Sequence, residues 1–326
     1  VGGNTPEGKV IYTNFLDEDG GVHADLTISR LGSDSYRVVT GGADGNRDWV
    51  TLRNYRDDNG LNADINIRTH DIATLGLWGP KAVNALGNFI DPNEIDIQNF
   101  PFVTAKNLTL NLSGGKKVDV WAARISYVGE SGWEIYFNNN KDDGLALYDS
   151  LLEVGVVPVG IETYANSRRL EKSFRLQGAD LETEYTAIEA AIQRPLVKEA
   201  DFHGKAAHLS HREEDPCAIL CTMTLDDLNV SGVPRYPVGI SPIIDPATGE
   251  VPIDSKGRRS YTTGMSYCPS IKKFVVMGYL PKELAIQGKQ LLIEYFNEDG
   301  DGVYPITVQI VGKGSLYDPN NERVRA

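Results

Sequence analysis

The sequence RISYVGESGWEIYF, residues 124–137, alternates apolar and polar residues and is interrupted at Gly129 and Gly132. This pattern predicts two β-strands joined by a tight glycine turn. Tyr127 and Glu134 flank the turn, which allows a flat ring and a carboxylate to face the same pocket. A carboxylate accepts two parallel N–H bonds from a planar heterocycle, so the pair predicts a site for such a ligand. From the spacing alone, an ordinary hairpin with a packed tyrosine and an exposed glutamate is the simpler interpretation.

The segments around this stretch mix short strands with a few helices. Alternating apolar residues indicate strands, and apolar residues three and four positions apart indicate helices. Because the strands are mostly joined as antiparallel hairpins, the mixture predicts the α+β class rather than a doubly wound sheet. The predicted elements are strands at 10–16, 22–31 and 35–40, a helix at 44–56, a strand at 72–77, a helix at 80–89, strands at 104–112 and 118–128, and helices at 142–154 and 164–174.

The pattern changes after residue 211. From residue 216 onward, short apolar strands are separated by clusters of proline, glycine and aspartate. Regularly spaced short strands of this kind predict a small β-barrel or β-sandwich, with a domain boundary near residue 212. The loop NEDGDG, 297–302, is predicted to be a hairpin turn, because Val308 stands where a calcium loop requires glutamate.

The composition limits the classes of partner. Hydrophobic residues make up 41% of the 326 residues, which is typical of a globular protein, and no apolar run is long enough for a membrane span. The net charge of −13 argues against nucleic acid and anionic lipid as partners. The start of the sequence lacks the pattern of a secretory signal, so we expect a cytoplasmic protein, or one of the mitochondrial matrix if the source is eukaryotic. The three cysteines are predicted to be reduced.

Common catalytic and metal-binding motifs do not fit the sequence. His203, His208 and His211 lack the spacing of a zinc helix, and we predict no metal site. The run TGGADG, 40–45, lacks the glycine spacing of a dinucleotide site, and no nucleophile elbow or phosphate loop is present. The sequence therefore favours a protein that binds a planar ligand and acts through positioning and electrostatics.

The predicted helix at 164–174 and its end carry an unusual concentration of positive charge in an acidic chain. The basic residues allow two interpretations. They form either a solvated helix face paired with acids such as Glu171, or a site for a carboxylate tail. These residues are Arg168, Arg169, Lys172 and Arg175.

Six stretches, in order along nearly the whole chain, resemble the folate-dependent aminomethyltransferase family, whose type member is the T-protein of the glycine cleavage system. SYVGESGWEIY is similar to the family signature Y-T-G-E-x-G-x-E-I. Each stretch is a weak signal alone, and the shared order makes the resemblance specific. The other five are YTNFLDEDGGVHADLTISRL, LGLWGPKA, SRRLEKSFRLQGADL, DFHGKAA and TTGMSYCPSIKKFVVMGYL.

The resemblance implies a T-protein-like α+β fold with three parts around a central ligand hole. These parts would be a split N-terminal folate-binding domain, a ferredoxin-like domain and a C-terminal β-barrel. In this sequence we expect the split domain at 1–62 and 156–211, with its N-terminal part truncated. The ferredoxin-like domain would cover 63–155 and the barrel 212–326.

The resemblance also implies which residues hold the cofactor. Glu134 would grip the pterin ring of tetrahydrofolate, and Tyr127 would line the same pocket. Tyr12 and Asp17 lie in the hairpin that would cover the ligand. Arg169 is the expected partner of the glutamate tail, although the neighbouring arginines are alternatives.

Two departures from the family concern charged residues. The T-protein has an arginine where Ala165 stands here. The family's catalytic aspartate would fall at or before Val1, since no aspartate precedes Asp17, so the catalytic residue of this chain is unknown. We therefore expect the chain to be a fragment, a subunit or a stand-alone relative.

The sequences of several stretches are similar to the folate-binding half of dimethylglycine and sarcosine dehydrogenases and oxidases. The resemblance implies one-carbon transfer from a methylated amine, giving 5,10-methylenetetrahydrofolate, with a flavin amine oxidase domain or subunit as partner. One alternative is a tetrahydrofolate-dependent demethylase of a methylated sulfur or oxygen compound. Another is a non-catalytic folate-binding or accessory module of a flavin amine oxidase.

Overall fold

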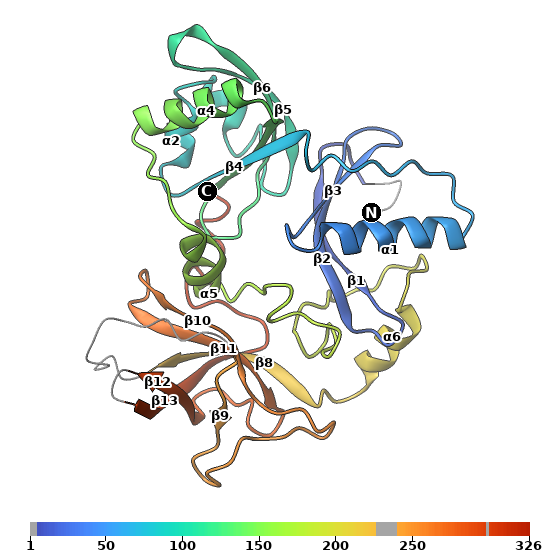
Figure 1. Ribbon diagram of the computed structural model, residues 1–326, viewed down its shortest axis with the longest axis vertical. Helices are drawn as coiled ribbons and strands as arrows, with labels where there is room; N and C mark the ends of the chain where they lie inside the picture. The colour runs from blue at the N-terminus through green and yellow to red at the C-terminus, as the bar shows by residue number, and fades with distance from the viewer. Residues whose placement is uncertain (1–4, 226–239, 298–299) are drawn as a thin grey trace. The chain divides into compact units, whose positions relative to one another are not determined.

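The computed structural model describes residues 5–225, 240–297 and 300–326, which form two compact units (Figure 1). Unit 1 contains the chain up to Thr13, Asp25–Val159 and Asn321–Ala326, and unit 2 contains Asn14–Ala24 and Gly160–Asn320. The division falls within strands β1 (Val10–Leu16) and β2 (Val22–Arg30), so the tip of this hairpin is assigned to unit 2. The mixture of helices and antiparallel sheets confirms the predicted α+β class.

A four-stranded antiparallel sheet organises unit 1, in the order β4-β7-β6-β5. Alternate residues of β7 point to opposite faces. Trp133 and Ile135 face a core shared with Leu147 of helix α4, whereas Glu134 and Tyr136 face the other side. The elements are β4 (Ile72–Trp78), α2 (Ala82–Leu86), α3 (Pro92–Ile95), β5 (Ala105–Asn111), η1 (Ser113–Gly115), β6 (Lys117–Ala123), β7 (Gly132–Asn138) and α4 (Lys141–Glu153).

The second face of this sheet carries a smaller apolar cluster. Val10 of β1 packs there with Trp121 and Tyr136, and Val39 of β3 packs against the cluster. Strand β3 (Tyr36–Thr40) pairs with β2 in the three-stranded sheet β1-β2-β3, and helix α1 (Gly45–Asp58) follows it. The base of the N-terminal hairpin and the four-stranded sheet therefore share a core within unit 1.

A six-stranded antiparallel sheet dominates unit 2, in the order β10-β11-β8-β13-β12-β9. Its two ends meet, because Pro242 bridges Tyr261 and the amide of Thr262 donates to the carbonyl of Ser241 at 2.9 Å. The sequence predicted either a β-barrel or a β-sandwich, and the pairing of the two ends of the sheet shows that this part is a barrel. The strands are β8 (Ala218–Leu225), β9 (Ile243–Ile244), β10 (Thr262–Cys268), β11 (Lys273–Pro281), β12 (Gln290–Asn297) and β13 (Gly300–Val311).

The helices differ most from the predicted elements. The segment predicted as a helix at 164–174 is a π-helix, η2 (Glu162–Arg168), continued by one turn of α-helix, α5 (Arg169–Glu171). Helix α6 (Lys205–Glu213) precedes the barrel. Along the described ranges, no helix is both long enough and apolar enough to span a membrane. Residues 298 and 299, in the predicted turn of the NEDGDG loop, lie outside the described residues.

Candidate functional site

The stretch 124–137 forms a long loop followed by a strand, so the prediction of two strands joined by a tight turn was wrong. Strand β6 ends at Ala123 and β7 begins at Gly132, with loop 124–131 between them. The register explains the difference, because Ala123 already pairs with Glu134. Beyond that pair the backbone of Arg124 bonds to Val103 and Thr104, at 2.8 Å each, and no longer follows β7.

Both glycines of this stretch are required by the backbone. Gly129 has a φ of +75°, in the left-handed region that favours glycine. Gly132 has a φ of +154°, and a Cβ there would stand 2.0 Å from the carbonyl oxygen of Leu77. The close approach lets β7 start directly beside β4, and it fixes where Glu134 lies on the sheet.

Loop 124–131 is held by side chains that the sequence did not single out. The buried guanidinium of Arg124 donates to the carbonyls of Ile95 and Phe100, at 3.0 and 2.9 Å. The indole of Trp78 donates to the carbonyl of Ile125 at 2.8 Å. These three bonds tie the loop to the core side of unit 1, so Tyr127 is carried on an anchored loop.

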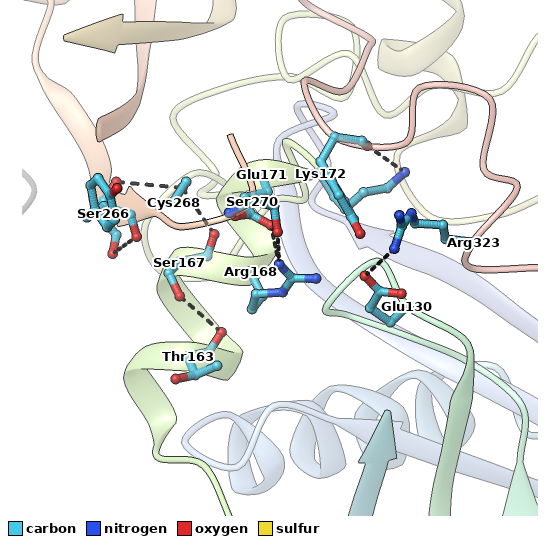
Figure 2. Close-up of polar contacts among 12 residues, drawn as sticks. Glu130, Thr163, Ser167, Arg168, Glu171, Lys172, Ser266, Cys268, Ser270 and Arg323 are labelled. Carbon is cyan, nitrogen blue, oxygen red and sulfur yellow. Dashed lines mark hydrogen bonds and ion pairs between the residues drawn. The ribbon is translucent and has the colours of Figure 1, made fainter. Parts of the chain in front are cut away.

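The C-terminal segment of unit 1, 321–326, lies against the same loop. Ser131 Oγ donates to the backbone oxygen of Ala326 at 2.6 Å. Arg323 lies 3.8 Å from the buried carboxylate of Glu130, as Figure 2 shows. Val324 is buried. The C-terminal segment and loop 124–131 are almost 200 residues apart in sequence, so no local sequence pattern predicts that they lie together.

Glu134 lies on β7, half-buried on the face opposite the main core. Burial raises the pKa of its carboxyl group, and the hydrogen bond that Tyr136 donates to Oε2 partly offsets this shift. No donor within the described ranges bonds to Oε1. A half-buried carboxylate with one occupied and one open oxygen suits a ligand that presents N–H groups.

The two tyrosines of the predicted site also belong to unit 1. Tyr127 is half-buried in loop 124–131. Tyr12 is exposed on β1, and its hydroxyl donates to Asp25 Oδ2 at 3.1 Å. Burial raises the pKa of Asp25, and the nearby Asp44 and Asp48 raise it further against the effect of the Tyr12 bond. The sequence analysis missed Asp25, whose only signal is a charged residue amid the alternation of β2.

Asp17 belongs to unit 2, at the tip of the β1–β2 hairpin. Its carboxylate accepts from the amide of Gly21 at 2.7 Å, and its carbonyl accepts from Gly20 at 3.2 Å. A Cβ on Gly204 would stand 2.3 Å from the Asp17 carbonyl oxygen, so helix α6 begins against this turn. The Asp17 carboxylate therefore has a structural role in the turn, and its role toward a ligand stays a prediction.

Arg169, the predicted partner of a glutamate tail, is buried in unit 2. Only 1% of its surface is exposed, and its guanidinium forms an ion pair with the fully buried Asp180. It also donates to the carbonyls of Ala165 and Phe174, at 2.7 and 3.0 Å. A role for Arg169 in tail binding stays a prediction, and any tail would compete with Asp180.

The neighbouring basic side chains are also used inside unit 2. The expected pairing of a basic residue with Glu171 is present, but this part of the helix is largely buried and is not a solvated face. Lys172 is buried and donates to the carbonyls of Tyr317 and Asp318. Arg175 donates to the carbonyls of Ala190 and Gly312, at 3.0 and 2.8 Å. Figure 2 shows Arg168 beside Glu171, whose Oε2 it meets at 2.6 Å.

Comparisons with known proteins agree with this geometry. Residues 3–199, more than half of the chain, match the family described as the GCVT N-terminal domain. The chain is 29% identical to human mitochondrial dimethylglycine dehydrogenase over 97% of this chain and 34% of that protein. It is 30% identical to the rat mitochondrial dimethylglycine dehydrogenase over 92% of this chain and 33% of that protein. The chain thus spans about a third of the length of these curated relatives.

A solved structure shows the same fold. The glycine cleavage system aminomethyltransferase T from Bartonella henselae superposes with a TM-score of 0.74 at 22% identity, over 94% of this chain and 76% of that one. The six-stretch resemblance is confirmed by these independent matches. Since the family match covers more than half of its length, the chain belongs to the GCVT family, the aminomethyltransferase family of the glycine cleavage T-protein.

Proposed function

We propose that this chain is a tetrahydrofolate-dependent one-carbon transferase that acts on a methylated amine, such as dimethylglycine or sarcosine. Family membership supports the transferase class, and the dimethylglycine dehydrogenases among its relatives support the amine. The observation that carries the proposal is the state of Glu134, a half-buried carboxylate with an open oxygen on the face opposite the core.

We propose a reduced pterin as the ligand of Glu134. The open oxygen of Glu134 would accept an N–H bond from the ring, and the added bond would favour the charged carboxylate that burial disfavours. Tyr127 and Tyr12 would supply flat apolar walls, and Asp17 and Arg169 are proposed for the covering hairpin and the glutamate tail. A flavin amine oxidase would first remove two electrons and a proton from the methylated amine to give its iminium. Bound tetrahydrofolate would supply N5, which would capture the iminium carbon and give 5,10-methylenetetrahydrofolate with release of the demethylated amine.

Isothermal titration of tetrahydrofolate into a Glu134→Ala variant tests the cofactor site. A hydrogen bond to a charged group is worth about 1.5–3 kcal/mol, so we expect roughly tenfold to a hundredfold weaker binding. Glu153→Gln, on the exposed end of α4 in the same unit, is the matched control and should bind as the parent chain does. Unchanged affinity in Glu134→Ala would refute the role of this carboxylate.

A second candidate function is an accessory folate-binding module of a flavin amine oxidase. The coverage of the relatives favours it, because the matched region is only about a third of each dimethylglycine dehydrogenase. Mixing the chain with tetrahydrofolate and sarcosine, with and without a separately supplied flavin amine oxidase, distinguishes the two. Formation of 5,10-methylenetetrahydrofolate that rises with added chain supports transfer, and binding without any such rise supports the accessory role.

A further inference from the structure

A polar groove of about 890 Å³ runs along the second face of the four-stranded sheet, within unit 1. Its size lies within the range of small-molecule sites. Trp121 of β6 and Tyr136 of β7, both buried, form the apolar floor at one end. Polar and charged side chains of β5, β6 and β7 line much of the rest, namely Asn107, Thr109, Asn111, Lys117, Asp119 and Asn138.

Arg37 of β3 closes the aromatic end of the groove without a counter-ion. Its guanidinium lies 4.2 Å from the centre of the Trp121 ring and 5.7 Å from that of Tyr136. Nη1 is buried and has no hydrogen-bond partner, and no carboxylate in the described part of the chain pairs with this side chain. A half-buried cation without an anion is unusual in a chain with a net charge of −13.

The surroundings of Arg37 increase the cost of its charge. Burial lowers the pKa of the guanidinium, and the neighbouring Arg68 lowers it further, whereas Tyr136 has the opposite effect. Arg68 already pairs with Asp71 at 2.7 Å. One uncompensated positive charge therefore remains at this end of the groove. A guanidinium stacked on an aromatic ring keeps its N–H edge free, and that edge matches a carboxylate.

We propose that this groove binds a small molecule through a carboxylate that pairs with Arg37. Arg37 would pair with one carboxylate, and the exposed Lys117, which lines the groove together with Glu94 and Asp119, is a second cation for a ligand with two carboxylates. The carboxylate has two sources, a free acid or the glutamate tail of the cofactor proposed above, in which case Arg37 would replace Arg169 as the partner of the tail. Only the second source rests on the proposed function, and Tyr136 connects the two sites through its bond to Glu134.

Titration of glutarate into the whole chain at low ionic strength tests the site directly. We expect saturable one-to-one binding that weakens at least about tenfold in Arg37→Met and is screened by added salt. Arg53→Met is the matched control, because Arg53 also stacks on a tryptophan, Trp49, at 4.8 Å but on helix α1 outside the groove.

Two further measurements separate the outcomes. In the parent chain, the Nε–Hε NMR signal of Arg37 should shift on addition of glutarate, which requires no variant. Titration of tetrahydrofolate and of tetrahydropteroate, which lacks the glutamate, distinguishes the two sources of the carboxylate. If the glutamate tail is the ligand of Arg37, the Arg37→Met variant should bind tetrahydrofolate more weakly than the parent chain does. Its affinity for tetrahydropteroate should be unchanged. Equal glutarate binding by Arg37→Met, or no saturable binding of any of these acids, overturns the proposal. Glutarate binding should persist in Glu134→Gln, so the two sites fail independently.

Discussion

The binding role proposed for Glu134 carries a cost in stability. Its pKa is raised in the folded chain, mainly by burial, so the folded state holds its proton more tightly than the unfolded state does. Stability from this group is therefore complete below the ordinary pKa of 4.5 and is lost as the pH rises through the raised value. At neutral pH the charged carboxylate destabilises the fold, and we attribute its presence to the ligand.

A Glu134→Gln variant should consequently be more stable than the parent chain at neutral pH. The amide keeps an acceptor for Tyr136 and removes the buried charge, so we expect a gain of roughly 1 kcal/mol above the raised pKa. The gain should vanish below about pH 4.5. Urea unfolding at several pH values measures it, with Glu153→Gln as the exposed control. A variant that is less stable than the parent at pH 8 would contradict the cost that we assign to the buried charge of Glu134.

Gly264 is a second residue whose role the structure makes plain. A Cβ at this position would stand 2.6 Å from Nη2 of Arg169, which is fixed by its ion pair with Asp180. Overpacking of a rigid site costs about 1–3 kcal/mol, so Gly264→Ala should lower the free energy of unfolding by that amount. Gly160→Ala, where the Cβ meets open space, should leave it unchanged. Denaturant midpoints of the two variants are the measurement, and equal midpoints would show that the arginine moves aside.

At the scale of elements, alternation predicted most of the strands. The predicted strand at 72–77 is β4 (Ile72–Trp78), and the predicted helix at 142–154 is α4 (Lys141–Glu153). Both have a local cause, since one face of each is apolar at the right period. The family signature, with Glu134 and Tyr127 on one stretch, was likewise visible in the sequence, because its glycines and acids have fixed spacing.

Elements whose form depends on distant partners were not predictable. The alternation of apolar and polar residues in loop 124–131 resembles that of a strand. The side chain of Arg124, however, is buried and donates hydrogen bonds to the carbonyls of Ile95 and Phe100. The π-helix η2 looks like an ordinary helix, and it is held by bonds such as that of Ser266 to Glu162 at 2.8 Å. The Arg37 groove is also non-local, since β3, β5, β6 and β7 all contribute to it.

At the scale of the whole molecule, two half-buried carboxylates of unit 1 contrast with two buried carboxylates of unit 2. Asp25 and Glu134 of unit 1 have raised pKa values, because burial outweighs their hydrogen bonds. Glu189 and Asp254 of unit 2 have lowered pKa values, because bonds from Arg258 and from backbone amides outweigh burial. The first pair is suited to a binding role in unit 1, and the second pair stabilises unit 2.

The Arg258 cluster therefore predicts how the molecule responds to acid. Arg258 pairs with Glu189 and with Asp254, the latter at 2.7 Å, and lies 4.3 Å from the ring centre of Tyr185. Lowered pKa values mean that this stability is complete above the ordinary values of 4.5 and 3.8 and is lost as the pH falls through the lowered ones. Removal of one partner from a buried ion pair typically costs about 3–5 kcal/mol.

Urea unfolding of Arg258→Met between pH 3 and pH 7 measures this contribution. At pH 7 we expect a loss of about 3–5 kcal/mol, because two buried carboxylates lose their cation. The difference from the parent should narrow as the pH falls, since protonated carboxyls no longer need a counter-charge. Arg68→Met removes an exposed pair with Asp71 and should cost less than about 1 kcal/mol at every pH. If Arg258→Met does not fold at pH 7, recovery of its fold at low pH would equally support a role for the charge of Arg258. A loss of stability that does not depend on pH would contradict this role. It would mean that Arg258 contributes through packing on Tyr185.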